Sequence, residues 1–317
     1  MITAMALALS AVHVRTTRVG PVAGELPYFQ MVSFENNFAF NVDAKVKVII
    51  NDNVKVNASF NIPVYNDVKD KERAMFTITF ANPKGGSGKT TSAMLLAEQI
   101  LHAGATVAIL DCDPNQNIVQ WAIQRTEKGR AVPYNVQPVP SETTFLDAVD
   151  AIRGTADYLI IDLEGTASQL MTYAISQSDL VLIPFEPTPM EARQAARAVQ
   201  LVRNTSRMMN RQVAHALLFV KVNAAMKTND EKDVRGELEA NDVPMLQSAI
   251  VRRAAYTRIF RDGYLLSELL EQAREDVKKS TASAQERALK PLEAAIQNAR
   301  EYTQEVVNHL SEQKAAA

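Results

Sequence analysis

The amino-acid sequence predicts an α/β protein with a doubly wound, mostly parallel sheet, helices on both faces and a short β-patterned N-terminal extension. From Met75 onward, short apolar runs typical of buried strands alternate with longer stretches of helical periodicity. Upstream, residues 33–66 alternate apolar and polar side chains, which is typical of strands with one exposed face. With 317 residues and 47% hydrophobic content, the chain is long enough for one large domain plus an extension.

Residues 1–74 are predicted to form the β-patterned extension, and the sequence does not identify its role. Two alternating runs, 45–48 and 54–56, flank Asn51-Asp52-Asn53 and predict a strand, a turn and a strand. The polar residues 65–74 are predicted as a linker. Two interpretations stay open: an additional β-hairpin unit, or a read-through segment upstream of a true start at Met75.

The second predicted domain, 75–317, contains the alternating strands and helices. Its first strand is predicted at 75–83, followed by a helix over 91–104 that ends at a glycine. The further strands are runs of apolar residues at 106–113, 157–165, 179–187 and 214–223. A helix is predicted at 117–129, and the chain is predicted to end in helix from about Leu265 to Ser311, interrupted at Pro291.

The composition excludes several classes of protein. A formal net charge of -2 excludes a highly basic DNA-coating protein, although it leaves room for a local basic patch. The single cysteine, Cys112, excludes a disulfide framework and a cysteine-ligated iron–sulfur cluster within one chain. No apolar run reaches the ~18 residues of a transmembrane helix, and the apolar N-terminus lacks the preceding basic residues of a secretory signal. We therefore expect a reduced, cytoplasmic protein.

The strongest functional signal lies between the first predicted strand and the first predicted helix. It reads Lys84-Gly85-Gly86-Ser87-Gly88-Lys89-Thr90-Thr91. Glycines allow backbone N–H groups to converge on phosphate oxygens, and the N-terminus of the following helix adds the positive end of its dipole. The segment therefore predicts a phosphate-binding loop, in which Lys89 contacts the β- and γ-phosphates of a nucleotide and the Thr90 hydroxyl ligates Mg²⁺.

The loop departs from the general pattern G-x-x-x-x-G-K-[ST], because Pro83 stands where the first glycine is expected and Lys84 precedes the glycine pair. This KGGxGKTT arrangement resembles the deviant Walker A motif of the ParA/MinD family of P-loop ATPases, and the similarity extends from Met75 to the end of the chain. The resemblance implies a weak, partner-stimulated ATPase that uses ATP and Mg²⁺. It also implies that Lys84 reaches across an ATP-dependent homodimer to the partner's nucleotide, as an arginine finger does.

Two strand ends resemble further parts of the family pattern. ILDCDPNQN (109–117) resembles the segment that follows the family's second strand. This implies that Asp111 lies near the metal and that Asp113, the third expected catalytic residue beside Lys84 and Lys89, orients or activates the attacking water. LIIDLEG (159–165) resembles the Walker B strand, which implies that Asp162 holds Mg²⁺.

Departures from the family pattern leave some roles open. Asn115 replaces the usual glutamine, and Leu163-Glu164-Gly165-Thr166 follows the Walker B aspartate instead of a small residue and two prolines. Glu164 is interpreted either as a second carboxylate near the γ-phosphate or as a solvated loop residue. The adenine-contacting residues are not identified by the sequence.

Two groups of arginines are candidates for binding phosphates. The segment 249–263 resembles a C-terminal stretch of ParA-like proteins, which bind DNA without sequence preference through basic residues of that region; its arginines are Arg252, Arg253, Arg258 and Arg261. Intramolecular ion pairs are the alternative for these four. A second group falls within an arc of ~120° on one predicted helix, which favours a phosphate-binding or dimer surface or an ordinary solvated face; it comprises Arg193, Arg197, Arg203, Arg207 and Arg211.

The resemblance implies a nucleoid-associated ATPase switch that dimerises with ATP, binds DNA non-specifically and drives plasmid or chromosome partition through a centromere-binding adaptor. Two alternatives remain open: recruitment of a relaxosome-type adaptor in conjugative DNA transfer, and positioning of a protein cargo. Residues 292–317 carry more acidic than basic side chains, so the basic membrane-binding helix of MinD-type proteins is not expected.

Overall fold

The computed structural model describes residues 75–139, 141–165 and 168–316, with side chains up to residue 312, and four short strands upstream of Met75. The chain divides into two compact units, Met1–Lys71 and Glu72–Ala317.

In the first unit, β1 (Val14–Thr16) pairs antiparallel with β2 (Val32–Phe34), and β3 (Lys45–Ile49) pairs antiparallel with β4 (Lys55–Ser59). The pairing of β3 with β4 confirms the two strands predicted there. The turn predicted at 51–53 and the linker predicted before Met75 lie outside the described residues.

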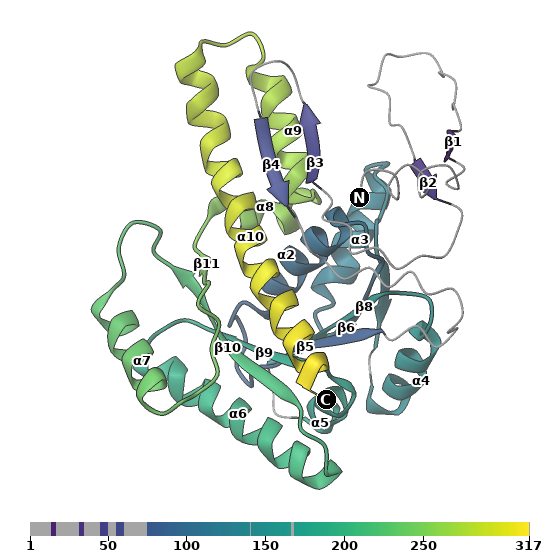
Figure 1. The fold of residues 1–317 in the computed structure, drawn as a ribbon, viewed down its shortest axis with the longest axis vertical. Helices are drawn as coiled ribbons and strands as arrows, with labels where there is room; N and C mark the ends of the chain where they lie inside the picture. Colours follow the sequence, from purple (N-terminus) through teal and green to yellow (C-terminus); the bar gives the residue numbers. More distant parts are fainter. Residues whose placement is uncertain are drawn as a thin grey trace, which may run out of the picture. The chain divides into compact units, whose positions relative to one another are not determined.

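The second unit is built around a seven-stranded sheet in the order β11-β10-β9-β5-β8-β6-β7, in which all neighbouring strands are parallel (Figure 1). The strands are β5 (Phe76–Phe80), β6 (Val107–Cys112), β7 (Asn135–Pro138), β8 (Tyr158–Leu163), β9 (Leu180–Phe185), β10 (Ala214–Val222) and β11 (Ile250–Val251). The predicted α/β fold class is confirmed. Strands β7 and β11 were not predicted, because β7 is a partly exposed edge strand and β11 has only two residues.

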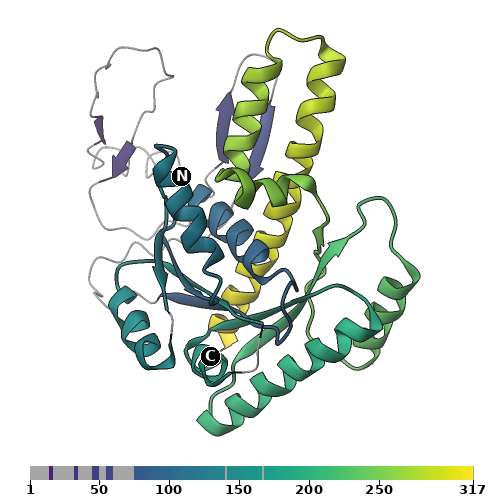
Figure 2. The same cartoon turned by 180° about the vertical axis from the view of Figure 1, so that it is seen from behind.

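Helices cover both faces of this sheet (Figures 1 and 2). They are α2 (Lys89–His102), α3 (Asn117–Glu127), α4 (Glu142–Ile152), α5 (Gln169–Gln177), α6 (Pro189–Met209), α7 (Asn229–Ala240), α8 (Ala254–Asp262), α9 (Leu266–Val277) and α10 (Ala282–Ala316). Helix α2 contacts β5, β6, β8 and β9, and α10 packs on α2. Helices α5 and α6 cover the opposite face and contact one another.

The central strands are buried along their whole length, because both faces of the sheet are covered. Ile78, Ile160 and Ile183 are fully buried. Burial of a side chain of this size stabilises the fold by about 1.5–3 kcal/mol. This requirement explains why the strands read as uninterrupted apolar runs in the sequence.

The strand order brings the predicted site residues to one edge of the sheet. Strand β5 lies between β8 and β9, and β8 lies between β5 and β6. The register places Asp162 directly beside Phe80 on one side and beside Asp111 on the other. The carboxyl ends of parallel strands are where ligands bind in open α/β sheets.

The C-terminal helical region differs from the prediction at Pro291. The predicted interruption there is wrong, since α10 continues through Pro291, and the break lies instead between α9 and α10. Proline removes the N–H that would bond to the carbonyl of Arg287, but Pro291 is exposed, so water can satisfy that carbonyl. Within the described residues, no helix combines the length and hydrophobicity needed to cross a membrane.

Candidate nucleotide site

The loop from Lys84 to Gly88 connects β5 to α2, as predicted, and two of its glycines have backbone angles that other residues rarely adopt. Gly86 has φ 72° and Gly88, which precedes α2, has φ 91°. The start of the loop is anchored by Asn82, which is fully buried. Its amide donates to the Pro184 carbonyl at 2.8 Å, and its side-chain oxygen accepts the Lys84 N–H at 3.0 Å. The loop is therefore held against the end of β9.

Lys89 lies inside this loop. Its side chain is buried, with 5% exposure, and its ammonium donates to the Asn82 carbonyl at 3.2 Å and to the Lys84 carbonyl at 3.1 Å. Burial lowers the pKa of Lys89, while the negative charges of Asp162, Asp113 and Glu164 oppose that shift. The ammonium is thus a desolvated cation surrounded by carboxylates and loop carbonyls.

Asp162, at the end of β8, has an unusual environment for a carboxylate. It is fully buried, and neither of its oxygens has a hydrogen-bond partner among the described residues. Burial raises its pKa to about 7; the nearby charges of Asp111 and Asp113 add to that shift, and Thr90 and Lys89 oppose it. The Thr90 hydroxyl lies near this carboxylate, since it opposes the rise in the pKa of Asp162.

An unpartnered carboxylate beside a threonine hydroxyl fits the oxygen ligands that Mg²⁺ prefers. No cluster of three or more histidine, cysteine, aspartate or glutamate side chains suited to a metal occurs in the described part of the chain. Mg²⁺ at nucleotide sites uses one or two protein oxygens together with phosphates and water, so this donor set suits it.

Asp111 and Asp113, the other two predicted carboxylates, lie at the same edge. Asp111 is almost fully buried, and one of its oxygens accepts the N–H groups of Ile118 at 2.9 Å and Val119 at 3.1 Å. It therefore holds the N-terminus of α3 to the end of β6. Its predicted role near the metal stays a prediction. Asp113 is more exposed, and its carboxylate accepts both the backbone and side-chain N–H groups of Asn115 at 2.8 Å.

The backbone after β8 packs directly against the phosphate loop. A Cβ atom placed on Gly165 would lie 2.3 Å from the Gly85 nitrogen and 2.7 Å from the Lys84 carbonyl carbon. Real Cβ atoms do not approach so closely, so only glycine fits at this position. Sequence reasoning did not single out Gly165, although it falls inside the segment that resembled Walker B.

Lys84 forms an ion pair with Glu191 in the first turn of α6. The sequence did not predict this contact. The local signal for the position of Glu191 was the Thr188-Pro189 pair, since the Thr188 hydroxyl accepts the Glu191 N–H and Pro189 begins the helix.

A cavity of about 510 Å³ opens beside the N-terminus of α2. It is lined by Gly88, Thr91, Ser92, Val220, Lys221, Ile250, Val251, Arg252, Arg253, Ala254, Tyr256, Thr257 and Phe260. Lys221 adopts φ 57°, and its ammonium donates to the Gly86 carbonyl and to Glu186, both at 2.7 Å. This cavity is continuous with the phosphate loop through Gly88 and is large enough for a planar base and a sugar.

The structure separates the four arginines predicted to bind DNA. Arg252 lies 3.5 Å from a Glu186 oxygen, and both Arg252 and Arg253 line the cavity beside α2. Arg258 and Arg261 each pair with Asp262, at 3.1 and 2.7 Å. The hydrogen bonds from these two guanidinium groups hold the pKa of Asp262 well below its usual range. Intramolecular ion pairs, the alternative interpretation, therefore occur for Arg252, Arg258 and Arg261.

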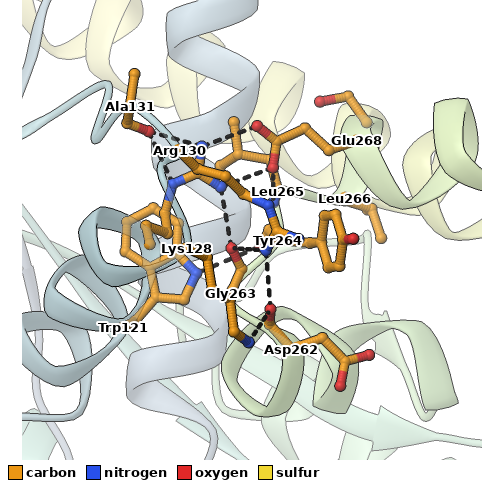
Figure 3. Close-up of polar contacts among 12 residues, drawn as sticks. Trp121, Lys128, Arg130, Ala131, Asp262, Gly263, Tyr264, Leu265, Leu266 and Glu268 are labelled. Carbon is orange, nitrogen blue, oxygen red and sulfur yellow. Dashed lines mark hydrogen bonds and ion pairs between the residues drawn. The ribbon is translucent and has the colours of Figure 1, made fainter.

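A polar cluster ties α3 to the turn between α8 and α9 (Figure 3). Arg125, with 2% exposure, donates to the carbonyls of Ala131 and Gly263 and to both oxygens of Glu268. Arg130 stacks 3.6 Å above the Tyr264 ring and donates to the Gly263 carbonyl. Because Asp111 holds the N-terminus of α3 to the end of β6, this cluster links the candidate site to α8.

Comparisons with known proteins identify the family of this chain. The family model described as VirC1 protein matches residues 75–310. The protein named ParA of Rhizobium radiobacter is 33% identical over 191 residues, which are 60% of this chain and 84% of that protein.

Two solved structures share the fold. Apo McdA of Cyanothece superposes with a TM-score of 0.52 at 19% identity, over 70% of this chain and 100% of that chain. A plasmid partition protein of Borrelia burgdorferi bound to AMPPNP gives 0.50 at 18% identity, over 76% and 100%. Motif order, sheet topology and the match over most of the second unit lead to one conclusion: the chain belongs to the VirC1 family of ParA/MinD-type P-loop ATPases.

Proposed function

We propose that this chain binds ATP with Mg²⁺ and hydrolyses it slowly, as a nucleotide-dependent switch. The observation that carries the proposal is the position of Lys89. Its ammonium is buried among carbonyls of its own phosphate loop and within reach of the charge of Asp162, whose oxygens have no hydrogen-bond partner among the described residues. A phosphate chain in the loop offers this lysine stronger acceptors than two backbone carbonyls. Mg²⁺ at Thr90 and Asp162 would neutralise charge on the transferring phosphoryl group.

The positions of the other site residues suggest what each would do when ATP is bound. The backbone N–H groups from Gly85 to Thr91 lie at the N-terminus of α2, where they can donate to phosphate oxygens. Asp113 lies close enough to Lys89 for its charge to act on it, which suits a residue that orients the attacking water. Glu164 is also close to Lys89, which favours a second carboxylate at the site over a solvated loop residue. Asp111 positions α3 at the same edge.

The cavity beside α2 supplies a place for the nucleoside of ATP. Gly88 lines it from the phosphate loop, Thr91 from α2 and Tyr256 from α8. This assigns Arg252 and Arg253 to the surroundings of the nucleotide instead of to a separate DNA surface.

We further propose that two ATP-bound chains associate through Lys84 and that the dimer binds DNA non-specifically on the nucleoid in the cytoplasm. Partition of plasmid or chromosomal DNA with a centromere-binding adaptor is the favoured role, supported by the relative named ParA. Recruitment of a relaxosome-type adaptor and positioning of a protein cargo are the alternatives.

Binding of a fluorescent ATP analogue, with and without Mg²⁺, tests the nucleotide site. Lys89→Ala is expected to weaken binding at least a hundredfold, because the lysine is the buried cation of the loop. Lys278→Ala is the matched control, since Lys278 is exposed and, among the described residues, forms an ion pair only with Glu275. Equal binding by wild type and Lys89→Ala would refute the proposed site.

Light scattering with ATP and with ADP tests dimerisation, and electrophoretic mobility of duplex DNA tests DNA binding. We expect a dimer and a DNA shift with ATP only. An ATP-bound protein that ignores DNA at low salt would leave the positioning of a protein cargo as the role. Capture of a partner by the ATP dimer from cells, followed by its identification, separates partition from relaxosome recruitment.

A further inference from the structure

Residues 192–229 contain no aspartate or glutamate. The basic side chains of this segment are Arg193, Arg197, Arg203, Arg207, Arg211, Lys221 and Lys227. The segment covers most of α6 and all of β10. A chain whose total charge is near zero thus has one long stretch with basic but no acidic side chains, of which Lys221 pairs with Glu186 from outside the stretch.

Helix α6 arranges these arginines as a line on its solvent side. The helix is continuous from Pro189 to Met209, and Thr205 and Ser206 are buried within it. Four exposed arginines therefore lie on one side, opposite buried Ala195, Val199 and Val202; they are Arg193, Arg197, Arg203 and Arg207. At 1.5 Å per residue, the line from the first to the last is about 21 Å long. Figures 1 and 2 show α6 along one margin of the second unit, on the outside of the sheet.

The line ends at a cavity of about 530 Å³, and no carboxylate is among the described residues that line it. It is lined by Arg203, Ser206, Arg207, Asn210, Arg211, Gln212, Val213 and His215. Arg211 is held in place by the carbonyls of Ser176 at 3.0 Å and Ser178 at 2.7 Å. The Nε2 atom of His215 is buried without a hydrogen-bond partner in the described part of the chain.

These arginines differ from those of α8 in their charge balance. Arg258 and Arg261 share the single counter-charge of Asp262, so the two arginines together present less positive charge than two without any counter-charge. Arg203 and Arg207 form no ion pair within the residues that the structure describes. An exposed cation without a counter-charge contributes fully to the local potential, whereas a paired cation contributes little beyond its partner.

We propose that the arginine line of α6, with the cavity at its end, binds the phosphate backbone of DNA. The inference rests on the proposed function and names the surface that carries out its DNA-binding step. A single small anion would need only the cavity, whereas cations spread over about 21 Å match an extended polyanion whose phosphates recur every ~3.4 Å along one strand. Arginine guanidinium groups bind phosphate through two parallel hydrogen bonds without reading bases.

The test compares two double variants of the ATP-bound protein by fluorescence anisotropy with a labelled 30-base-pair duplex. Arg203→Gln/Arg207→Gln is expected to weaken binding at least tenfold. It should also reduce the slope of log affinity against log salt by about 2, since each lost phosphate contact contributes about 0.9. Arg258→Gln/Arg261→Gln is the matched control and should remain within about twofold of wild type. ATP binding and the mass of the ATP dimer should be unchanged in both variants.

Other outcomes would overturn the inference in distinguishable ways. If only the α8 variant loses DNA binding, the surface is wrong and the proposed function stands. If the wild type does not bind DNA with ATP, both this inference and the proposed DNA-binding role fail, and positioning of a protein cargo is left. If polyglutamate of equal charge competes as well as DNA, the surface binds acidic peptides instead. If the α6 variant no longer dimerises, α6 belongs to the subunit interface.

Discussion

Lys84 and Glu191 form an ion pair within one chain, between the phosphate loop and the first turn of α6. Glu191 is largely buried, whereas the Lys84 side chain is 40% exposed. Glu191 also lies where the helix dipole favours a negative charge. The cation that we propose to act on a partner's nucleotide is therefore held by a carboxylate of its own chain. Dimerisation through Lys84 requires this ion pair to break.

Glu191→Gln should make ATP-dependent dimerisation easier, because Gln keeps the size of the side chain and removes its charge. A partly exposed ion pair contributes up to about 1 kcal/mol, so the ATP concentration for half-maximal dimerisation should fall by about threefold to fivefold. Analytical ultracentrifugation across an ATP titration measures this. Glu237→Gln, at an exposed position of α7, is the control. An unchanged midpoint would show that the ion pair does not restrain Lys84.

Gly165→Ala should weaken ATP binding more than tenfold, because its methyl group would overlap the backbone of Gly85 and displace the loop. Gly236→Ala is the matched control. A Cβ at Gly236 meets no atom within 4 Å, and alanine there should stabilise α7 by about 0.5–1 kcal/mol. Calorimetric titration with ATP and thermal unfolding of both variants separate the two effects. Wild-type affinity in Gly165→Ala would contradict the observed packing.

Asp162→Asn should affect the free and the nucleotide-bound protein in opposite directions. Without ligand, removal of a buried, unpartnered charge should raise the free energy of unfolding by roughly 1–3 kcal/mol. With Mg²⁺ and ATP, the variant should lose most of the ligand-induced rise in Tm that the wild type shows. Differential scanning fluorimetry, with and without EDTA, measures both. A variant stabilised by Mg²⁺ and ATP as strongly as the wild type would exclude Asp162 from the metal site.

Glu268→Gln should lower stability in a pH-dependent way, because Glu268 binds the buried guanidinium of Arg125. Although burial of Glu268 opposes the shift, hydrogen bonds from Arg125 and the Leu265 N–H lower the pKa of Glu268 below its ordinary value of 4.5. A group whose pKa is lower in the folded state stabilises the protein at pH values above its ordinary pKa. This stabilisation is lost as the pH falls through the folded-state pKa. Urea unfolding should therefore show a large difference from wild type at pH 7 and a smaller one near pH 3.

Arg125→Met tests the same cluster from the other side. It leaves Glu268 and the carbonyls of Ala131 and Gly263 without their buried donor, and should cost about 3 kcal/mol. Arg153→Met is the control, because Arg153 is exposed. A cost below 1 kcal/mol for Arg125→Met would show that other donors of the cluster replace it.

The positions of the loop, the central strands and the aspartates at their ends were predictable from local patterns. An apolar run followed by glycines and a helical pattern predicts a strand, a loop and a helix. A buried parallel strand must end in such a loop before its helix can pack back on the sheet. The same reasoning failed at β7, whose side chains are half exposed, and at Pro291, whose place on the solvent side of α10 no local pattern reveals.

Contacts between distant segments depended on packing that a linear pattern does not contain. The pairing of Lys84 with Glu191, the fit of Gly165 against Gly85 and the cavity at Arg252 and Arg253 each join parts of the chain far apart in sequence. The sequence also did not show which arginines have a carboxylate partner. Arg258 and Arg261 of α8 pair with Asp262, whereas Arg203 and Arg207 of α6 form no ion pair among the described residues. Residue order along the chain was sufficient for the fold class and the phosphate loop, because both are recognised from short-range patterns. Which charged side chains form ion pairs depends on their neighbours in the folded structure, so only the tertiary structure shows where net charge remains on the surface.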